Sequence, residues 1–219
     1  LLIEGARQVG KSYVIREVGQ RLFANYVELN FVTDNEGVQL FKNVHTVDEF
    51  YLRLSSVAGD RLGNYNDTLI FLDEIQCYPQ YLTLLKFLRE EQKYRFIASG
   101  SALGMALRHT TSIPVGSVII RKMYPLDFEE FLWANNYGEN AIEDLYKHFT
   151  EQQQLSEEQH EQLLELFRRY LLVGGLPDVV NEYLATHNIL NVRNLQNAIA
   201  AMYEADASQY ENNASRRLL

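Results

Sequence analysis

The sequence has little of what would support a disulfide-stabilised or membrane-spanning protein. Its 219 residues include one cysteine and four prolines. Because the lone Cys77 cannot form an intramolecular disulfide, we expect a reducing, intracellular setting and a cytoplasmic protein. No apolar run approaches the roughly 18–20 residues of a membrane span, so no membrane partner is expected. The five histidines follow no metal-ligand spacing, which argues against a catalytic metal held by histidines.

Positive charge is also scarce, with 20 Lys and Arg against 29 Asp and Glu and a formal net charge of −9. This balance argues against a surface that binds nucleic-acid phosphates without regard to sequence, so any DNA binding should be weak and salt-sensitive. Hydrophobic residues make up 47% of the chain, which predicts a folded core. The chain begins at Leu1 without an initiating methionine, and we interpret this start as the cut edge of a longer polypeptide.

Up to about Pro125, short β-branched or aromatic runs alternate with longer helical patterns. This alternation predicts an α/β fold with a parallel sheet covered by helices. The expected strands are 1–4, 26–31, 68–72, 94–98 and 118–123, and the expected helices between them are 11–23, about 38–57 and 81–91.

After Pro125 the strand-like runs disappear and helical patterns dominate, at 127–133, 141–149, 156–172, 176–185 and 192–205. We therefore expect a domain boundary near 124–126. The third of these helices has clear end signals, with Ser156 as its N-cap and the Gly174 and Gly175 pair as its stop.

The segment "GARQVGKS", which begins at Gly5, matches the P-loop pattern G-x-x-x-x-G-K-[ST]. Two glycines allow the backbone to point successive N–H groups at phosphate oxygens, and the helix dipole after the loop adds positive potential. Lys11 is expected to reach the β- and γ-phosphates, and the Ser12 hydroxyl to complete a Mg²⁺ ligand set. The residues expected to bind the nucleotide are Gly5, Ala6, Arg7, Gln8, Val9, Gly10, Lys11, Ser12 and Tyr13.

The segment "TLIFLDEIQ" is an apolar run that ends in two carboxylates. A buried parallel strand presents such residues at its carboxyl end, where ligands bind in α/β folds. Asp73 is expected to hold Mg²⁺, and Glu74 to polarise the attacking water in ATP hydrolysis. Taken alone, the same pattern also fits a strand that simply leaves the core.

A second apolar strand ends in Ser99 and Ser101. Either hydroxyl could contact the γ-phosphate or the water, and Ser99 is the candidate we assign a catalytic role. The alternative is a plain turn followed by a helix cap. No arginine is clearly placed as an arginine finger that would stabilise the transition state, although Arg95, Arg108 and Arg121 are candidates.

With these motifs in order, the sequence resembles a prokaryotic family of AAA-type ATPases, the AAA_14 class, whose members carry a C-terminal domain named DUF4143. They are relatives of archaeal-type and STAND-like P-loop ATPases. Two segments carry the likeness: "YPLDFEEFL" from Tyr124 and "YLLVGGLP" from Tyr170. The loop departs from the family in one place, where Ala6 precedes Arg7 and proline is common.

The resemblance implies a P-loop NTPase core, AAA+-like, with three αβα layers and a five-stranded parallel sheet of order 5-1-4-3-2. It further implies a core over 1–125, a helical lid over 126–190 and the truncated start of a winged-helix-like or linker region over 191–219. The DUF4143 domain itself is expected to lie beyond the end of this chain, which would thus be cut at both ends.

The function expected from motifs and resemblance together is Mg²⁺-dependent ATP hydrolysis, with ATP and Mg²⁺ bound and ADP as product, coupled to conformational change or partner binding. The alternative is a nucleotide-gated switch with little hydrolysis, which engages DNA or a protein through its helical regions. In either case a neighbouring subunit could supply the missing arginine in a homo-oligomer. A small-molecule kinase fits less well, because the Asp-Glu pair suits water activation better than acceptor binding.

Overall fold

The computed structural model describes residues 1–101 and 118–216. The chain divides into two compact units, Leu1–Tyr124 and Pro125–Leu219, and each has its own core. Within the described residues, no helix combines the length and apolar character needed to cross a membrane.

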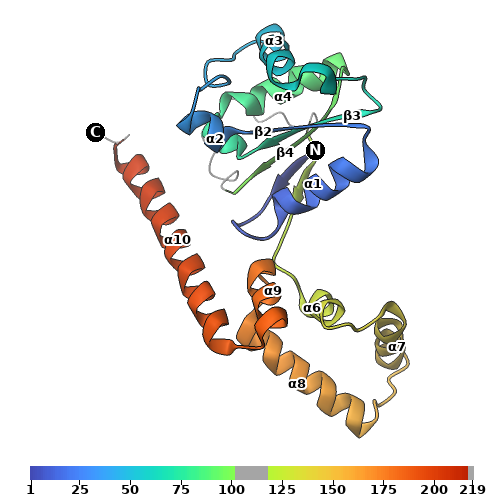
Figure 1. Cartoon of the computed structure of the whole chain (residues 1–219). Helices are drawn as coiled ribbons and strands as arrows, with labels where there is room; N and C mark the ends of the chain where they lie inside the picture. Colours follow the sequence, from blue (N-terminus) through green and yellow to red (C-terminus); the bar gives the residue numbers. More distant parts are fainter. Residues whose placement is uncertain (102–117, 217–219) are drawn as a thin grey trace. The chain divides into compact units, whose positions relative to one another are not determined.

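The first unit is built on a five-stranded, entirely parallel sheet (Figure 1). Its strands are β1 (Leu2–Glu4), β2 (Asn25–Asn30), β3 (Thr68–Asp73), β4 (Arg95–Gly100) and β5 (Ile120–Lys122). The spatial order is β2-β3-β4-β1-β5, which confirms the expected order 5-1-4-3-2 read from the other edge. Strand β3 is buried along its whole length, as its continuous apolar sequence predicts.

Helices cover both faces of this sheet, so the expected three-layer αβα architecture is confirmed (Figure 1). The helices of this unit are α1 (Lys11–Leu22), α2 (Phe31–Glu36), α3 (Val47–Ala58) and α4 (Gln80–Glu91), with short 3₁₀ turns at Gly59–Arg61 and Ile75–Cys77. Helix α1 lies close to the sheet at Gly19, where an added Cβ would come within 2.5 Å of the Tyr26 ring. A glycine is needed here because the side chains of Tyr26 and Leu69 on the sheet pack directly against the backbone of the helix.

On the face of the sheet opposite α1, the core is rich in aromatic side chains. Phe31 is fully buried, and its ring centroid lies 4.6 Å from that of Tyr81 and 5.1 Å from that of Tyr78. Phe50 of α3 packs against Tyr81 with ring centroids 5.9 Å apart. These tilted and edge contacts are the arrangements that aromatic quadrupoles favour, and they join α2, α3 and α4 to one another.

Two local features differ from the sequence-based expectation. The helix expected over 38–57 begins only at Val47, and a short helix, α2, precedes it. The Asp34 carboxylate accepts the N–H groups of Leu40 (2.7 Å) and Phe41 (3.0 Å), which holds that stretch in turns. A capping box at Thr46 then starts α3.

The second unit is entirely helical in its described residues. Its helices are α6 (Phe128–Ala134), α7 (Glu139–Thr150), α8 (Glu157–Val173), α9 (Pro177–Thr186) and α10 (Ile189–Arg216). Residues 191–219, expected to begin a winged-helix-like region, thus lie mostly in the single helix α10. The core of the unit is formed by Phe131, Val173, Val179, Val180, Tyr183, Val192 and Ile199.

The "YLLVGGLP" segment ends α8 and holds the start of the unit. The Tyr170 hydroxyl donates to the Leu126 carbonyl (3.0 Å), and the Leu126 N–H donates to the Gly175 carbonyl (2.7 Å). A Cβ at Gly175 would come within 1.9 Å of the Leu126 carbonyl oxygen, so only glycine fits. Gly174 ends the helix with φ 76°, a conformation that glycine adopts without strain.

We predict that Phe31→Ala destabilises the first unit strongly, because it removes a fully buried ring that contacts two other aromatic rings. A buried phenylalanine truncation costs about 3–5 kcal/mol. Urea unfolding followed by circular dichroism measures this loss. The matched control is Phe87→Ala on α4, whose side chain is 46% exposed, and it should cost less than about 1 kcal/mol. Equal losses in both variants would contradict the aromatic core described here.

Candidate functional site

The loop from Gly5 to Gly10 joins β1 to α1 and has an unusual backbone. Gln8 and Gly10 have positive φ angles of 61° and 91°. Such left-handed residues let successive N–H groups point to the same side and form an anion-binding concavity. At Gly5 an added Cβ would lie 2.4 Å from the carbonyl oxygen of Met123, the residue after β5, so the backbone there leaves no room for a side chain.

The side chains of this loop differ in what they offer to a ligand. Val9 is fully buried, so only its backbone is available, whereas Ala6 and Arg7 are exposed. Tyr13, also expected to bind nucleotide, is 68% exposed in the first turn of α1. The loop therefore offers mainly backbone groups, as its two glycines predict.

Lys11 is a buried cation at the start of α1. Its Nζ donates to the carbonyl oxygens of Gly5 (3.0 Å) and Ala6 (2.6 Å). Burial lowers the pKa of Lys11 below its ordinary value, an effect opposed by the carboxylates of Glu74 and Asp73. The ammonium is thus desolvated and held by neutral carbonyls, a state in which an added anion would gain strongly from contact with it.

Asp73, at the carboxyl end of β3, is the centre of the site. The Ser12 hydroxyl donates to both of its oxygens, Oδ1 at 3.1 Å and Oδ2 at 3.0 Å. The buried Ser99 hydroxyl on β4 donates to Oδ1, and the Asn30 amide on β2 donates to Oδ2 at 3.3 Å. Three strands and α1 therefore converge on one buried carboxylate.

Glu74 follows in the left-handed region, with φ 55° and ψ 46°. The Gln76 side-chain amide donates to Glu74 Oε2 and also to the Ser101 hydroxyl, the latter at 3.2 Å. Gln76 thus connects the acid after β3 to the residue after β4. A non-glycine residue in this conformation is uncommon and often belongs to a functional site.

An ion pair fixes helix α1 to the sheet beside the loop. Arg16 Nη2 lies 2.7 Å from Glu28 Oε1, and the Tyr26 hydroxyl donates to Glu28 Oε2 at 2.9 Å. Burial raises the pKa of Glu28, but the hydrogen bonds from Arg16 and Tyr26 outweigh it, so the pKa lies below its ordinary value. Glu28 is therefore a charged anchor that holds the first turns of α1 in register with β2.

The structure brings together Lys11, Ser12, Asp73, Glu74 and Ser99 at the carboxyl ends of the strands. The arginine candidates are elsewhere or not described. Arg95 begins β4, at the opposite end of that strand from Ser99, and stacks on the Tyr65 ring at 4.9 Å. Arg121 is exposed on the edge strand β5, and Arg108 lies outside the described residues.

Two polar residues of the site were missed by the sequence reasoning, Asn30 and Gln76. Asn30 caps α2 by accepting the N–H groups of Val32 (3.0 Å) and Thr33 (3.2 Å), while its amide donates to Asp73. A strand that ends in Asn before a helix is a recognisable capping signal. Its contact with Asp73 follows only from the pairing of β2 with β3, where the two residues are in register.

The donor set suits a hard cation and a phosphate chain. Ser12 and Asp73 offer hydroxyl and carboxylate oxygens, which are the ligands that Mg²⁺ takes in proteins. Lys11 and the backbone N–H groups of the loop offer the positive field that a polyphosphate requires. The residues present therefore fit a Mg²⁺–nucleotide complex.

Comparison with known families supports this interpretation of the first unit. Residues 1–132 match the family model described as "AAA domain" (AAA_14), and residues 164–219 match a domain of unknown function, DUF8612. The second match differs from the DUF4143 domain that the resemblance associated with this family. The first unit is thus an ATPase-type nucleotide-binding module.

Among solved structures, the chain is similar to the Orc1 protein of Aeropyrum pernix, which was solved in complex with DNA. The sequences are 18% identical, the TM-score is 0.40, and the match covers 65% of this chain. The chain spans only 43% of the length of that protein. The search of curated proteins gave no match.

We predict that Gly5→Ala lowers the free energy of unfolding by about 1–3 kcal/mol, the usual cost of forcing an atom into a packed site. The reason is the 2.4 Å approach of the new Cβ to the backbone of Met123. Urea unfolding measures this cost. The matched control is Gly138→Ala, where a Cβ meets no atom within 4 Å, and it should cost less than about 1 kcal/mol. A neutral Gly5→Ala would show that the loop does not pack against the backbone of Met123 in this way.

Proposed function

The chain belongs to the AAA domain family, and on that premise we propose that it is a Mg²⁺-dependent ATPase. One observation carries the proposal: the P-loop serine and the acid at the end of β3 are in direct contact, with Ser12 Oγ 3.0 Å from Asp73 Oδ2. These two oxygen ligands come from segments far apart in the sequence. Their meeting beside a buried lysine is expected of a metal–nucleotide site rather than of a structural turn.

In this proposal the loop and Lys11 bind the phosphates of ATP. The backbone N–H groups of the loop and the start of α1 supply a fixed positive field, and Lys11 exchanges its carbonyl partners for phosphate oxygens. Ser12 and Asp73 would hold Mg²⁺, which supplies charge neutralisation on the β- and γ-phosphates when bound. The choice of adenine is part of the proposal and rests on the family match alone.

Glu74 orients the attacking water and accepts its proton. Its carboxylate is held by Gln76, so its position depends on that amide. Ser99 acts through Asp73, because its buried hydroxyl already donates to that carboxylate. Ser101 accepts a hydrogen bond from the Gln76 amide, and its hydroxyl is the one we assign to sensing the γ-phosphate.

The alternative function is a nucleotide-gated switch that hydrolyses ATP slowly. The bond from Gln76 to Glu74 favours it, because a carboxylate engaged by an amide is less available to water. Neither Arg95, which begins β4 at the end remote from Ser99, nor Arg121 on the edge strand β5 is placed as a transition-state arginine. This also fits slow turnover, since such an arginine is worth about 10³–10⁵ in rate. In that case a second copy of the chain would supply the arginine in a homo-oligomer.

We predict that the wild-type chain releases phosphate from ATP only when Mg²⁺ is present. Glu74→Gln should lower turnover by about 10²–10⁴-fold while ATP still binds, because it removes the base but leaves the phosphate site intact. Lys11→Ala should lower both binding and turnover. A coupled phosphate-release assay and fluorescent-nucleotide titration measure the two quantities.

The controls for these variants are Glu90→Gln and Lys86→Ala on α4, which make the same chemical changes at exposed positions. Both controls should leave binding and turnover unchanged. ATP binding without turnover in the wild type would select the switch. ATP binding that survives in Lys11→Ala as strongly as in Lys86→Ala would overturn the assignment of the site.

A further inference from the structure

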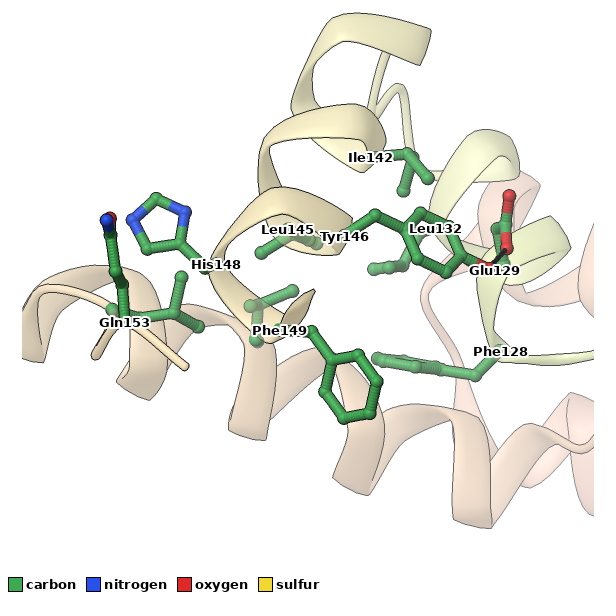
Figure 2. A pocket seen from close by; sticks show the side chains of 11 residues that line it. Phe128, Glu129, Leu132, Ile142, Leu145, Tyr146, His148, Phe149 and Gln153 are labelled. Carbon is green, nitrogen blue, oxygen red and sulfur yellow. Dashed lines mark hydrogen bonds between the residues drawn. The ribbon is translucent and has the colours of Figure 1, made fainter. Parts of the chain in front are cut away.

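A groove with almost entirely apolar walls runs through the helical unit, outside the nucleotide site (Figure 2). It lies between α6, α7 and the first turns of α8 and encloses about 560 Å³. The residues that line it are Phe128, Glu129, Leu132, Ile142, Leu145, Tyr146, His148, Phe149, Gln153, Leu155 and Leu163. Most of them lie after residue 132, where the AAA domain match ends, and before residue 164, where the DUF8612 match begins.

The floor of the groove consists of buried apolar residues, and exposed aromatic side chains line its sides. Leu132 and Ile142 are buried, 3% and 6% exposed, whereas Phe149 is 81% exposed and Tyr146 is 57% exposed. Figure 2 shows Phe149 pointing from α7 toward Phe128, and the Tyr146 hydroxyl donates to Glu129 at 2.7 Å. Exposed aromatic side chains gathered over an apolar floor mark a surface that another molecule covers.

The charge around the groove is strongly one-sided. From residue 127 to residue 163 the sequence has ten Asp or Glu and a single Lys, Lys147, which gives a net charge of −9 with histidines neutral. The whole chain also carries −9, so the remaining residues balance to zero. The negative charge of the protein is therefore concentrated in the helices that form the groove.

The apolar lining and the negative charge together indicate what kind of molecule the groove binds. The negative charge of this segment repels nucleic-acid phosphates, and it also repels a second copy of the same segment, which carries the same charge. It attracts a segment with lysine or arginine, and an apolar groove between helices accepts the apolar face of an amphipathic helix. We propose that the groove binds an amphipathic helix of a partner protein that has an apolar face flanked by basic side chains.

In the complex, apolar side chains at helical spacing enter between Phe128 and Phe149 and reach the floor at Leu132. Basic side chains beside that face meet the acidic residues of this segment, of which Glu129 lines the groove and Glu143 and Glu151 are exposed on the elements that form it. This assignment goes beyond the proposed ATPase, because it names a partner for the helical unit and does not depend on nucleotide chemistry.

The test is fluorescence anisotropy with the full chain and a labelled peptide of about 18 residues, in which leucines form one helical face and lysines flank it. Two comparison peptides are needed. One has the same composition in scrambled order, and the other has glutamates in place of the lysines. We expect the amphipathic basic peptide to bind at least tenfold more tightly than either, since only it offers both features.

The protein variant that locates the binding is Phe149→Ala, because this ring is exposed and its loss leaves the core intact. It should weaken the amphipathic peptide by about tenfold, the usual effect of losing one buried aromatic contact. The control is Leu190→Ala on α10, an apolar side chain 68% exposed outside the groove, which should leave binding unchanged.

The proposal is overturned if the basic amphipathic and scrambled peptides bind equally, since charge alone would then explain the binding. It is also overturned if the glutamate peptide binds as well, if Phe149→Ala has no effect, if none of the peptides binds, or if a short DNA duplex binds in a way that Phe149→Ala removes. Circular dichroism of each variant establishes that the helical unit is intact in every arm.

Discussion

The hydrogen bonding of the Asp73 carboxylate is the constraint on which the nucleotide-binding unit depends. A buried carboxylate without partners is very costly, so the groups that satisfy it must be held in place. Here those groups come from α1 (Ser12), β2 (Asn30) and β4 (Ser99). The parallel register of the sheet places these groups at the carboxyl ends of the strands, where the P-loop also lies. The order of the strands and the start of α1 thus bring together the hydrogen-bond partners of one buried carboxylate.

The parts of this arrangement that the sequence predicts are those encoded locally. The P-loop has its glycines at fixed spacing, β3 is a continuous apolar run, and the strands alternate with helical patterns. The parts that it does not predict depend on contacts between distant residues. The late start of α3 follows from the bonds that Asp34 makes to Leu40 and Phe41, and no periodicity records those bonds.

The same distinction explains which site residues were missed. Gln76 lies two residues after Glu74 in the sequence, but its role follows from reaching Ser101 at the end of β4. That contact needs β3 and β4 to be neighbours. Arg95 shows the opposite error, a residue that the sequence offered as a candidate but that does not belong to the site. Its side chain has the right chemistry, but it begins β4 at the end remote from the site.

The two units divide the chemistry of the chain between them. The first holds a buried lysine, two carboxylates and small hydroxyls at the carboxyl ends of its strands, and its charges nearly balance. The second carries the negative charge and an exposed aromatic groove. In the two proposals made above, nucleotide binding and partner recognition use opposite electrostatic requirements, since phosphates need a positive field and the acidic segment repels them.

The most direct test of this account is a crystal structure of the chain with Mg²⁺ and a non-hydrolysable ATP analogue. The account predicts the phosphates over the backbone from Gly5 to Ser12, with Lys11 Nζ moved from the Gly5 and Ala6 carbonyls to phosphate oxygens and the metal in contact with Ser12 Oγ. A nucleotide bound elsewhere, or bound over the loop while Lys11 keeps its carbonyl partners and no metal meets Ser12, would contradict it.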